Sequence, residues 1–179
     1  MEAYEEAGYT VVCLTDHNTV WSNDELADLR ARHSSMTIIP GIERTVGRGL
    51  EHLLILGTND PAYLATHKED VLIRKARTDG LLTILAHPFI TRESADMLRR
   101  GIYPDAIEYR TGSQEEKGAK LALAASTTIH RPLVNSGDVH HTSQVNQFWI
   151  ETQREVISIS DLRDVIRDGS YHNCTGSEL

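Results

Sequence analysis

The chain has 179 residues, of which 40% are hydrophobic and 25% charged, and this composition predicts one soluble domain over 1–179 with a well-buried core. Lysine and arginine number 18 against 26 acidic residues, so the formal net charge is -8 and no basic run offers a surface for a nucleic-acid backbone. No apolar stretch approaches the roughly 20 residues that span a bilayer, and the acidic start, MEAYEEAGY, is unlike a secretory signal. The sequence therefore argues against nucleic-acid and membrane partners and predicts a cytoplasmic protein.

Apolar runs of strand length alternate with helix-like stretches along the chain. The predicted strands are 9–15, 36–43, 52–57, 81–88, 105–110, 131–138 and 148–153. The predicted helices are 23–33 after Ser22, 60–80 opening at Asp60-Pro61, 92–100 after Thr91, 114–126 after Ser113, and 161–169 after Ser160.

This alternation predicts an α/β fold with a mainly parallel sheet. The connection TVGRGL (45–50) is too short for a crossover, so the second and third runs are expected to form a hairpin. Residues 172–179 are expected to be a frayed tail.

Histidine and carboxylate side chains gather at the ends of these runs. They are Asp16 and His17 after the first, Glu43 at the end of the second, His52 at the start of the third, His87 at the end of the fourth, Glu108 near the end of the fifth, and Asp138 and His140 after the sixth. The carboxyl ends of parallel strands share one face, where such residues would converge. Imidazole and carboxylate ligands without thiolates suit Zn²⁺, Mn²⁺ or Fe²⁺. One histidine alone is more often structural, so the prediction of a metal site rests on the whole pattern.

The phrases AGYTVVCLTDHNTV, IIPGIE, HLLILG, LLTILAHP, AIEYRTG and GDVHH occur in that order. From about Glu5 to His172 the chain resembles the polymerase and histidinol phosphatase (PHP) family of metal-dependent phosphoesterases, and the combined order of TDH, PGIE, AHP and DxH is specific. The resemblance implies a single PHP-like domain, a distorted (β/α)7 TIM-like barrel that holds two to three divalent metal ions. Zinc, manganese and iron are the expected metals, with magnesium as a further option.

Carried over by motif, the resemblance implies metal ligands at His17, Glu43, His52, His87, Asp138 and His140, with Glu43 bridging two ions. Asp16, Glu108 and His140 are the candidate catalytic groups, and Asp16 is expected to orient a ligand or a water molecule. A neighbouring histidine or aspartate would protonate the leaving alkoxide.

The chain departs from the family pattern in two places. The HxH motif of the first strand is absent, which predicts a barrel that is incomplete at the N-terminus, a weakened metal position and exposed strand edges that a homodimer could cover. Gly137 stands where the family usually has serine, which removes a hydroxyl from the rim of the pocket.

The predicted function is hydrolysis of small phosphate monoesters, such as nucleotides or histidinol phosphate, by a metal-activated hydroxide. Arg44, Arg48 and Arg110 are candidates for binding the substrate phosphate. One alternative is a degenerate PHP module that binds or regulates without turnover, which the missing HxH favours. Another is a metal-dependent hydrolase of amides or lactones.

Overall fold

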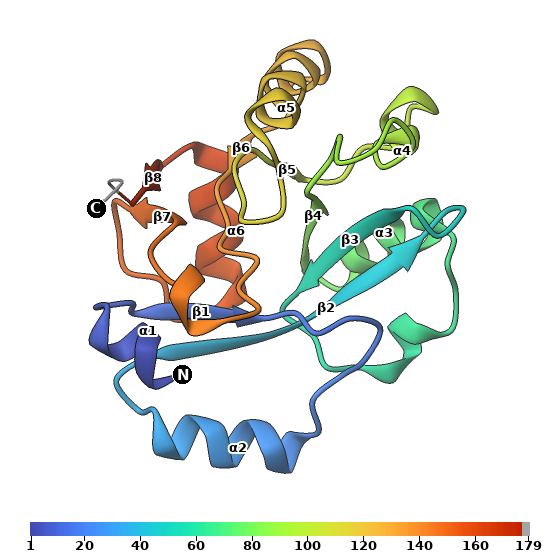
Figure 1. The fold of residues 1–179 in the computed structure, drawn as a ribbon. Helices are drawn as coiled ribbons and strands as arrows, with labels where there is room; N and C mark the ends of the chain where they lie inside the picture. The colour runs from blue at the N-terminus through green and yellow to red at the C-terminus, as the bar shows by residue number, and fades with distance from the viewer. Residues whose placement is uncertain (177–179) are drawn as a thin grey trace.

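A curled six-stranded sheet runs through the protein in the computed structural model, which describes residues 1–176 (Figure 1). Its strands lie in chain order: β1 (Val11–Leu14), β2 (Thr37–Val46), β3 (Glu51–Leu56), β4 (Leu82–Ala86), β5 (Ala106–Glu108) and β6 (Leu133–Val134). The helices are α1 (Glu2–Glu6), α2 (Asn23–Arg32), α3 (Glu69–Thr78), α4 (Asp96–Arg99), α5 (Glu116–Ile129) and α6 (Ile159–Asp168), with 3-10 turns η1 (Pro61–Leu64) and η2 (Thr142–Gln144). The architecture is therefore mixed α/β, as the alternation of elements predicts.

Strand direction is uniform except in β3. β1 is parallel to β2, and β4, β5 and β6 are parallel to one another, whereas β3 is antiparallel to both of its neighbours. The predicted hairpin between β2 and β3 is thus confirmed. Because β3 runs in the opposite direction, its amino end lies at the sheet edge where the carboxyl ends of its neighbours lie.

The period of two along each strand separates two hydrophobic layers. Leu54, Leu56 and Ile84 belong to a buried cluster with residues of α6, and Leu53 and Ile55 belong to a second cluster with residues of α3. The sheet is therefore apolar on both faces. Helices α6 and α3 pack on opposite sides of it.

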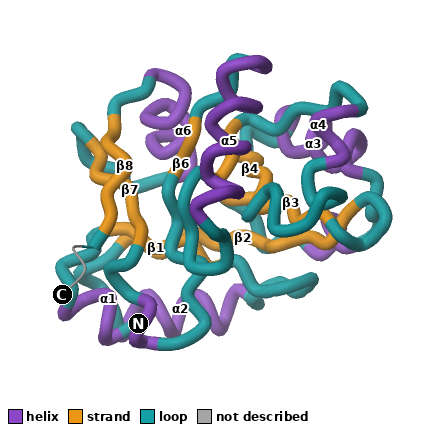
Figure 2. Tube along the Cα trace, turned by 45° about the horizontal axis from the view of Figure 1, so that its top comes forward, coloured by secondary structure: helices purple, strands orange, loops and turns teal. Residues whose placement is uncertain are grey.

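A second sheet contains two strands, β7 (Phe148–Thr152) and β8 (Tyr171–Thr175), which pair antiparallel. It lies next to β6, where the Asn173 side chain accepts from the backbone N–H of Asn135 at 2.6 Å and donates to the carbonyl of Leu133 at 2.9 Å (Figure 2). Residues 172–175 thus pair in a strand and are not frayed, which corrects that expectation. The remaining positions 177–179 lie outside the described residues.

Four predicted helices differ from those observed, and one of them is α5, which follows the N-cap Glu115 and not Ser113 and ends at Ile129 and not at 126. Helix α6 is capped by Ser158 and not by Ser160, because the Ser158 side chain accepts from the backbone N–H of Asp161. The segment 60–80 is divided into η1 and α3, and between them the Thr66 carbonyl accepts from buried Arg44 and the His67 carbonyl from the backbone N–H of Gly47. Helix α4 has only four residues, so most of 92–100 is irregular.

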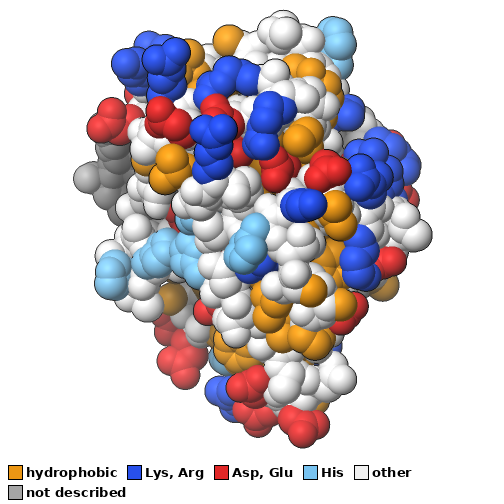
Figure 3. Space-filling view, turned by 90° about the vertical axis from the view of Figure 1, so that its right-hand side faces the viewer, with side chains coloured by type: hydrophobic (Ala, Val, Ile, Leu, Met, Phe, Trp, Pro, Cys, Tyr) orange, Lys and Arg blue, Asp and Glu red, His pale blue; other side chains and the backbone are white. Residues whose placement is uncertain are grey.

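No helix within residues 1–176 combines the length and apolar character needed to cross a membrane. Lysine and arginine side chains lie among aspartate and glutamate on the face drawn in Figure 3.

Candidate metal centre

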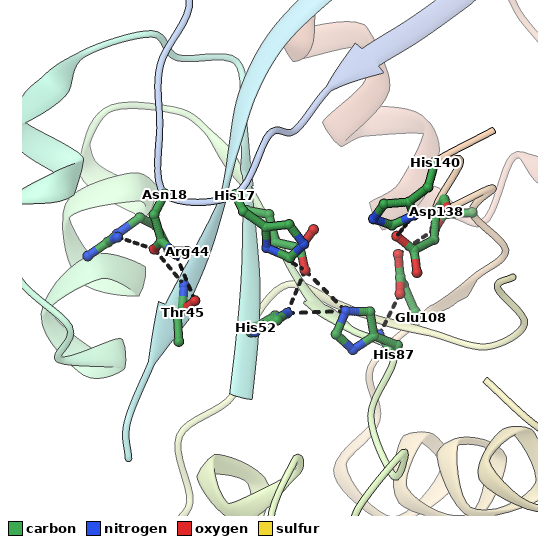
Figure 4. Close-up of polar contacts among 11 residues, drawn as sticks. His17, Asn18, Arg44, Thr45, His52, His87, Glu108, Asp138 and His140 are labelled. Atoms are coloured by element: carbon green, nitrogen blue, oxygen red, sulfur yellow. Dashed lines mark hydrogen bonds and ion pairs between the residues drawn. The ribbon is translucent and has the colours of Figure 1, made fainter. Parts of the chain in front are cut away.

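The histidine and carboxylate side chains predicted to bind metal come from neighbouring strands (Figure 4). His17 follows β1 and forms an isolated parallel bridge with Glu43 of β2. His87 comes directly after β4. His52 is the second residue of β3, and it reaches the same place only because β3 is antiparallel.

Glu43 is the centre of this group. Its Oε1 atom lies 2.6 Å from Nδ1 of His52, 3.1 Å from Nε2 of His87 and 3.7 Å from Nδ1 of His17. The His52 and His87 nitrogens are themselves 3.3 Å apart. One ligand atom from each of His17, Glu43 and His52 lies within 4.8 Å of the others, which is a spacing that one ion could bridge.

The electrostatics of Glu43 favour its ionised form. Burial opposes the charge, but hydrogen bonds from His52 and His87 and the charge of His17 outweigh it and lower the pKa of Glu43 to about 2. Burial also opposes the charged form of His87 and so acts to lower its pKa. The hydrogen bond to Glu43 and the charges of nearby carboxylates outweigh burial and raise the pKa of His87. The group therefore pairs a fixed anion with imidazoles.

Glu108 lies behind His87 and is 2% exposed. Its Oε2 accepts from the backbone N–H of His87 at 2.5 Å, and its Oε1 accepts from the hydroxyl of Ser136. Burial raises the pKa of Glu108 to about 7, although both hydrogen bonds act in the opposite direction. The residue holds the end of β4 in place.

Asp138 and His140 lie beside Glu108 in the close-up (Figure 4), and the ring centroid of His140 is 6.3 Å from that of His17. His140 Nδ1 is 3.0 Å from the carbonyl oxygen of Asp138 and 3.7 Å from its Oδ1. The Oδ2 atom of Asp138 is buried and has no hydrogen-bond partner among the residues described. A buried carboxylate oxygen without a partner is costly, so it marks a position for a cation or a water molecule.

A cavity of about 1710 Å³ joins the two groups of side chains. His17, Glu43, His87, Asp138 and His140 line part of it. Apolar side chains of the sheet and residues of β1, β7, α1 and α6 also line it. Five of the six predicted ligands therefore face a space that is large enough for a small substrate, and His52 is the one that does not line it.

Asp16 contacts a residue that the sequence analysis did not single out. Its Oδ2 accepts from the indole N–H of Trp21 at 2.6 Å, and both residues line the cavity. The Asp16 carboxylate is thus oriented at the rim, next to the ligand group and outside it.

The three arginines considered for phosphate binding lie in different surroundings. Arg44 is 2% exposed, and it does not line the cavity, since successive residues of a strand point to opposite faces and Glu43 takes the cavity side. Arg48 is exposed in the turn between β2 and β3 and does not line the cavity. Arg110 does line it and is 2.8 Å from Glu116.

Two further residues near the site, Ser136 and Asn18, were not predicted from the sequence. Ser136 directly precedes Gly137 and supplies a hydroxyl at the pocket, where the family pattern had suggested the loss of one. Asn18 follows His17, and its polar side chain in the phrase TDHNT was the available signal.

The fold and the site together define a class: a curled α/β sheet with a histidine and glutamate cluster suited to a divalent metal. No family model matches the chain, and no curated protein does. Among solved structures, the chain is similar to a two-domain protein from Bacteroides vulgatus that contains a predicted PHP-like metal-dependent phosphoesterase, with 16% identity and a TM-score of 0.71. The match covers 98% of this chain and 58% of that protein, so this chain spans less than two thirds of its length.

Two further structures share the fold. A candidate metal-dependent phosphoesterase from Bifidobacterium adolescentis is 12% identical, with a TM-score of 0.65 over 99% of this chain and 90% of that one. An amidohydrolase from Chromobacterium violaceum, solved with sulfate and no metal, is 12% identical, with a TM-score of 0.61 over 98% and 90% of the two chains. The chain therefore shares its fold with proteins named as PHP-like or metal-dependent phosphoesterases and with an amidohydrolase, which agrees with the resemblance seen in the sequence motifs.

Proposed function

We propose that this protein is a metal-dependent hydrolase of small phosphate esters, built on an incomplete (β/α)7 barrel of the PHP type. The observation that carries the proposal is the convergence of nitrogens from His17, His52 and His87 on one oxygen of Glu43. Fold likeness to proteins named as phosphoesterases supports the choice of reaction class.

The residues fit a divalent ion by their donor chemistry. Imidazole nitrogens and carboxylate oxygens are ligands of zinc, manganese and iron, and the unpartnered Oδ2 of Asp138 offers a further donor. We propose that His17, Glu43, His52, His87, Asp138 and His140 hold two to three ions. A bound ion of this kind polarises a phosphoryl oxygen and lowers the pKa of bound water from 15.7 to about 7.

Side chains around the cavity are suited to binding the phosphate, donating a proton and orienting water. Arg110 faces it and is suited to a phosphate oxygen, for which it would exchange its contact with Glu116. The Nδ1–H of His140 donates to the Asp138 carbonyl, so its Nε2 is free to bind metal or, when protonated, to donate to the leaving oxygen. Asp16, fixed by Trp21, is suited to orienting a water molecule at the rim.

Two other functions use the same site. Likeness to an amidohydrolase favours cleavage of amides or lactones as a second candidate. A third is a binding or regulatory module that holds metal without turnover.

The test begins with elemental analysis of the purified full chain after loading with Mn²⁺ or Zn²⁺ and dialysis. His87→Ala and Glu43→Ala are compared with His172→Ala, which removes an exposed histidine of β8 as a matched control. Each protein is then assayed on p-nitrophenyl phosphate, bis-p-nitrophenyl phosphate, a lactone and an anilide.

Bound metal and phosphomonoester hydrolysis in wild type and His172→Ala, both lost in the two site variants, support the proposal. Wild type without bound metal overturns it. Metal with lactone or anilide cleavage alone assigns the second candidate, and metal without any turnover assigns the binding module.

A further inference from the structure

Two residues that follow the predicted ligands are joined to each other. Asn18 comes after His17, and Arg44 comes after Glu43. The Oδ1 atom of Asn18 accepts hydrogen bonds from Nη1 of Arg44 and, at 3.0 Å, from the backbone N–H of Thr45 (Figure 4). Its amide nitrogen donates to the Thr45 hydroxyl at 2.8 Å, and its backbone N–H donates to the Glu43 carbonyl at 2.9 Å. The chain after His17 is thus fastened to β2 on both sides of Arg44.

Arg44 is buried without an acidic partner. Its Nη2 donates to the carbonyl of Thr66 at 2.9 Å and contacts that of Leu64 at 3.5 Å, and within residues 1–176 no carboxylate forms an ion pair with it. Burying a cation among neutral acceptors costs free energy that an apolar residue of similar size would avoid. Stability alone therefore gives a weak reason for an arginine here.

Asn18 also has an unusual backbone. Its φ of +51° lies in the left-handed region, which asparagine tolerates better than most other residues. The chain turns there directly after His17. The hydrogen bonds of the Asn18 side chain offset the cost of this turn.

Of the three histidines around Glu43, His17 most needs such an anchor. Its side chain is 49% exposed, and its nitrogen is 3.7 Å from Glu43, farther than those of His52 and His87. Few side-chain contacts hold His17, so its position depends on the backbone that carries it.

We infer that Asn18 and Arg44 are positioning residues that set the distance between His17 and Glu43 before a metal ion binds. The inference rests on the proposed metal centre. It predicts that the Asn18–Arg44 contact acts on metal affinity through donor geometry, and not only on the stability of the loop.

The test measures Co²⁺ binding to the metal-free full chain by titration, together with the visible spectrum of the bound ion and urea unfolding without metal. Asn18→Gly removes the side chain and permits a positive φ, so it separates the contact from backbone strain. Asn18→Asp keeps the oxygen that accepts from Arg44. Asn59→Ala is the matched control. The Asn59 amide donates to the carbonyl of Trp21 at 3.1 Å, and Trp21 lies in the loop that carries His17 and Asn18.

We expect Asn18→Gly to weaken Co²⁺ binding about 10- to 100-fold and to change the visible spectrum. Asn18→Asp should restore both towards wild type, and Asn59→Ala should leave both unchanged. Asn18→Gly with wild-type affinity and spectrum overturns the inference, whatever its stability. Wild type that binds no Co²⁺ instead overturns the metal centre itself, so the two failures are distinct.

Discussion

The carboxylate of Glu108 accepts a hydrogen bond from the backbone N–H of His87, with 2.5 Å between Oε2 and the nitrogen. Its other oxygen accepts from Ser136, which precedes the segment that carries Asp138. One buried side chain of β5 therefore joins the two halves of the candidate metal centre.

Replacing Glu108 tests the strength of this link. Glu108→Ala leaves the His87 N–H and the Ser136 hydroxyl unpaired, so we expect a loss of about 2–4 kcal/mol in the free energy of unfolding. Glu108→Gln keeps an acceptor for His87 and can donate to Ser136, and it should stay within about 1 kcal/mol of wild type. Urea unfolding of the metal-free proteins measures both, and equal losses in the two variants would contradict the role assigned to Glu108.

Arg100 lies between two buried carboxylates on the other side of the sheet. Its Nη2 is 2.8 Å from Glu51, and its Nη1 is 2.5 Å from Glu69. Burial raises the pKa of Glu51, while the backbone N–H of Met97 and the charge of Arg100 oppose that rise.

We expect Arg100→Ala to lower the free energy of unfolding by about 2–4 kcal/mol, because both carboxylates lose their cation and the half-exposed arginine limits the effect. The control is Arg154→Ala, which breaks a solvent-exposed pair with Asp168 and should therefore cost much less. Chemical denaturation at neutral pH compares them. A similar small loss in both would show that the Arg100 pairs contribute little.

Asp79 is expected to contribute to the loss of folding stability at acid pH. A hydrogen bond from Lys75 is the main cause that lowers the pKa of Asp79 below its ordinary value of 3.8, and a second one comes from the hydroxyl of buried Tyr63. Since the folded-state pKa is depressed, this stabilisation is complete above the unfolded-state pKa and is lost as the pH falls through the folded-state pKa.

Wild type should therefore lose stability more steeply below about pH 4 than Asp79→Asn, which has no charge to titrate. Urea midpoints measured from neutral to acid pH give the comparison. Parallel curves for the two proteins would contradict the prediction.

A divalent metal should stabilise the folded chain if the centre binds it. At a free Mn²⁺ concentration of 100 times the dissociation constant, the gain is about 2.7 kcal/mol, because the ion binds the folded state and not the unfolded one. Thermal unfolding with Mn²⁺ or with a chelator measures the gain in wild type and in His87→Ala. The increase should disappear in His87→Ala, and an equal increase in both would indicate binding elsewhere.

Much of the fold could be predicted from residue patterns. β-branched apolar runs located the strands, and TVGRGL between two of them predicted the hairpin that β2 and β3 form. Helix boundaries were less certain, because Ser158 and Ser160 are both acceptable caps and only packing selects between them.

The sequence located some residues of the candidate site and misled about others. His17 and His87 follow the ends of β1 and β4, as the sequence predicted, whereas Glu43 lies inside β2, which continues to Val46 beyond the predicted end of that strand. Arg44 looked like a phosphate ligand because it follows Glu43, but adjacent residues of a strand face opposite sides. Its buried partners, the carbonyls of 64 and 66, come from a distant segment that no local pattern reveals.

The sequence by itself determined seven of the eight strand segments, missing β8, and it determined which residue types could bind metal, because these follow from periodicity and ligand chemistry. Only the tertiary structure decided the strand register that brings His52 to Glu43, and the contacts from Ser136 to Glu108 and from Asn18 to Arg44. These depend on strand pairing and on packing between segments far apart in the chain, and neither is encoded by neighbouring residues.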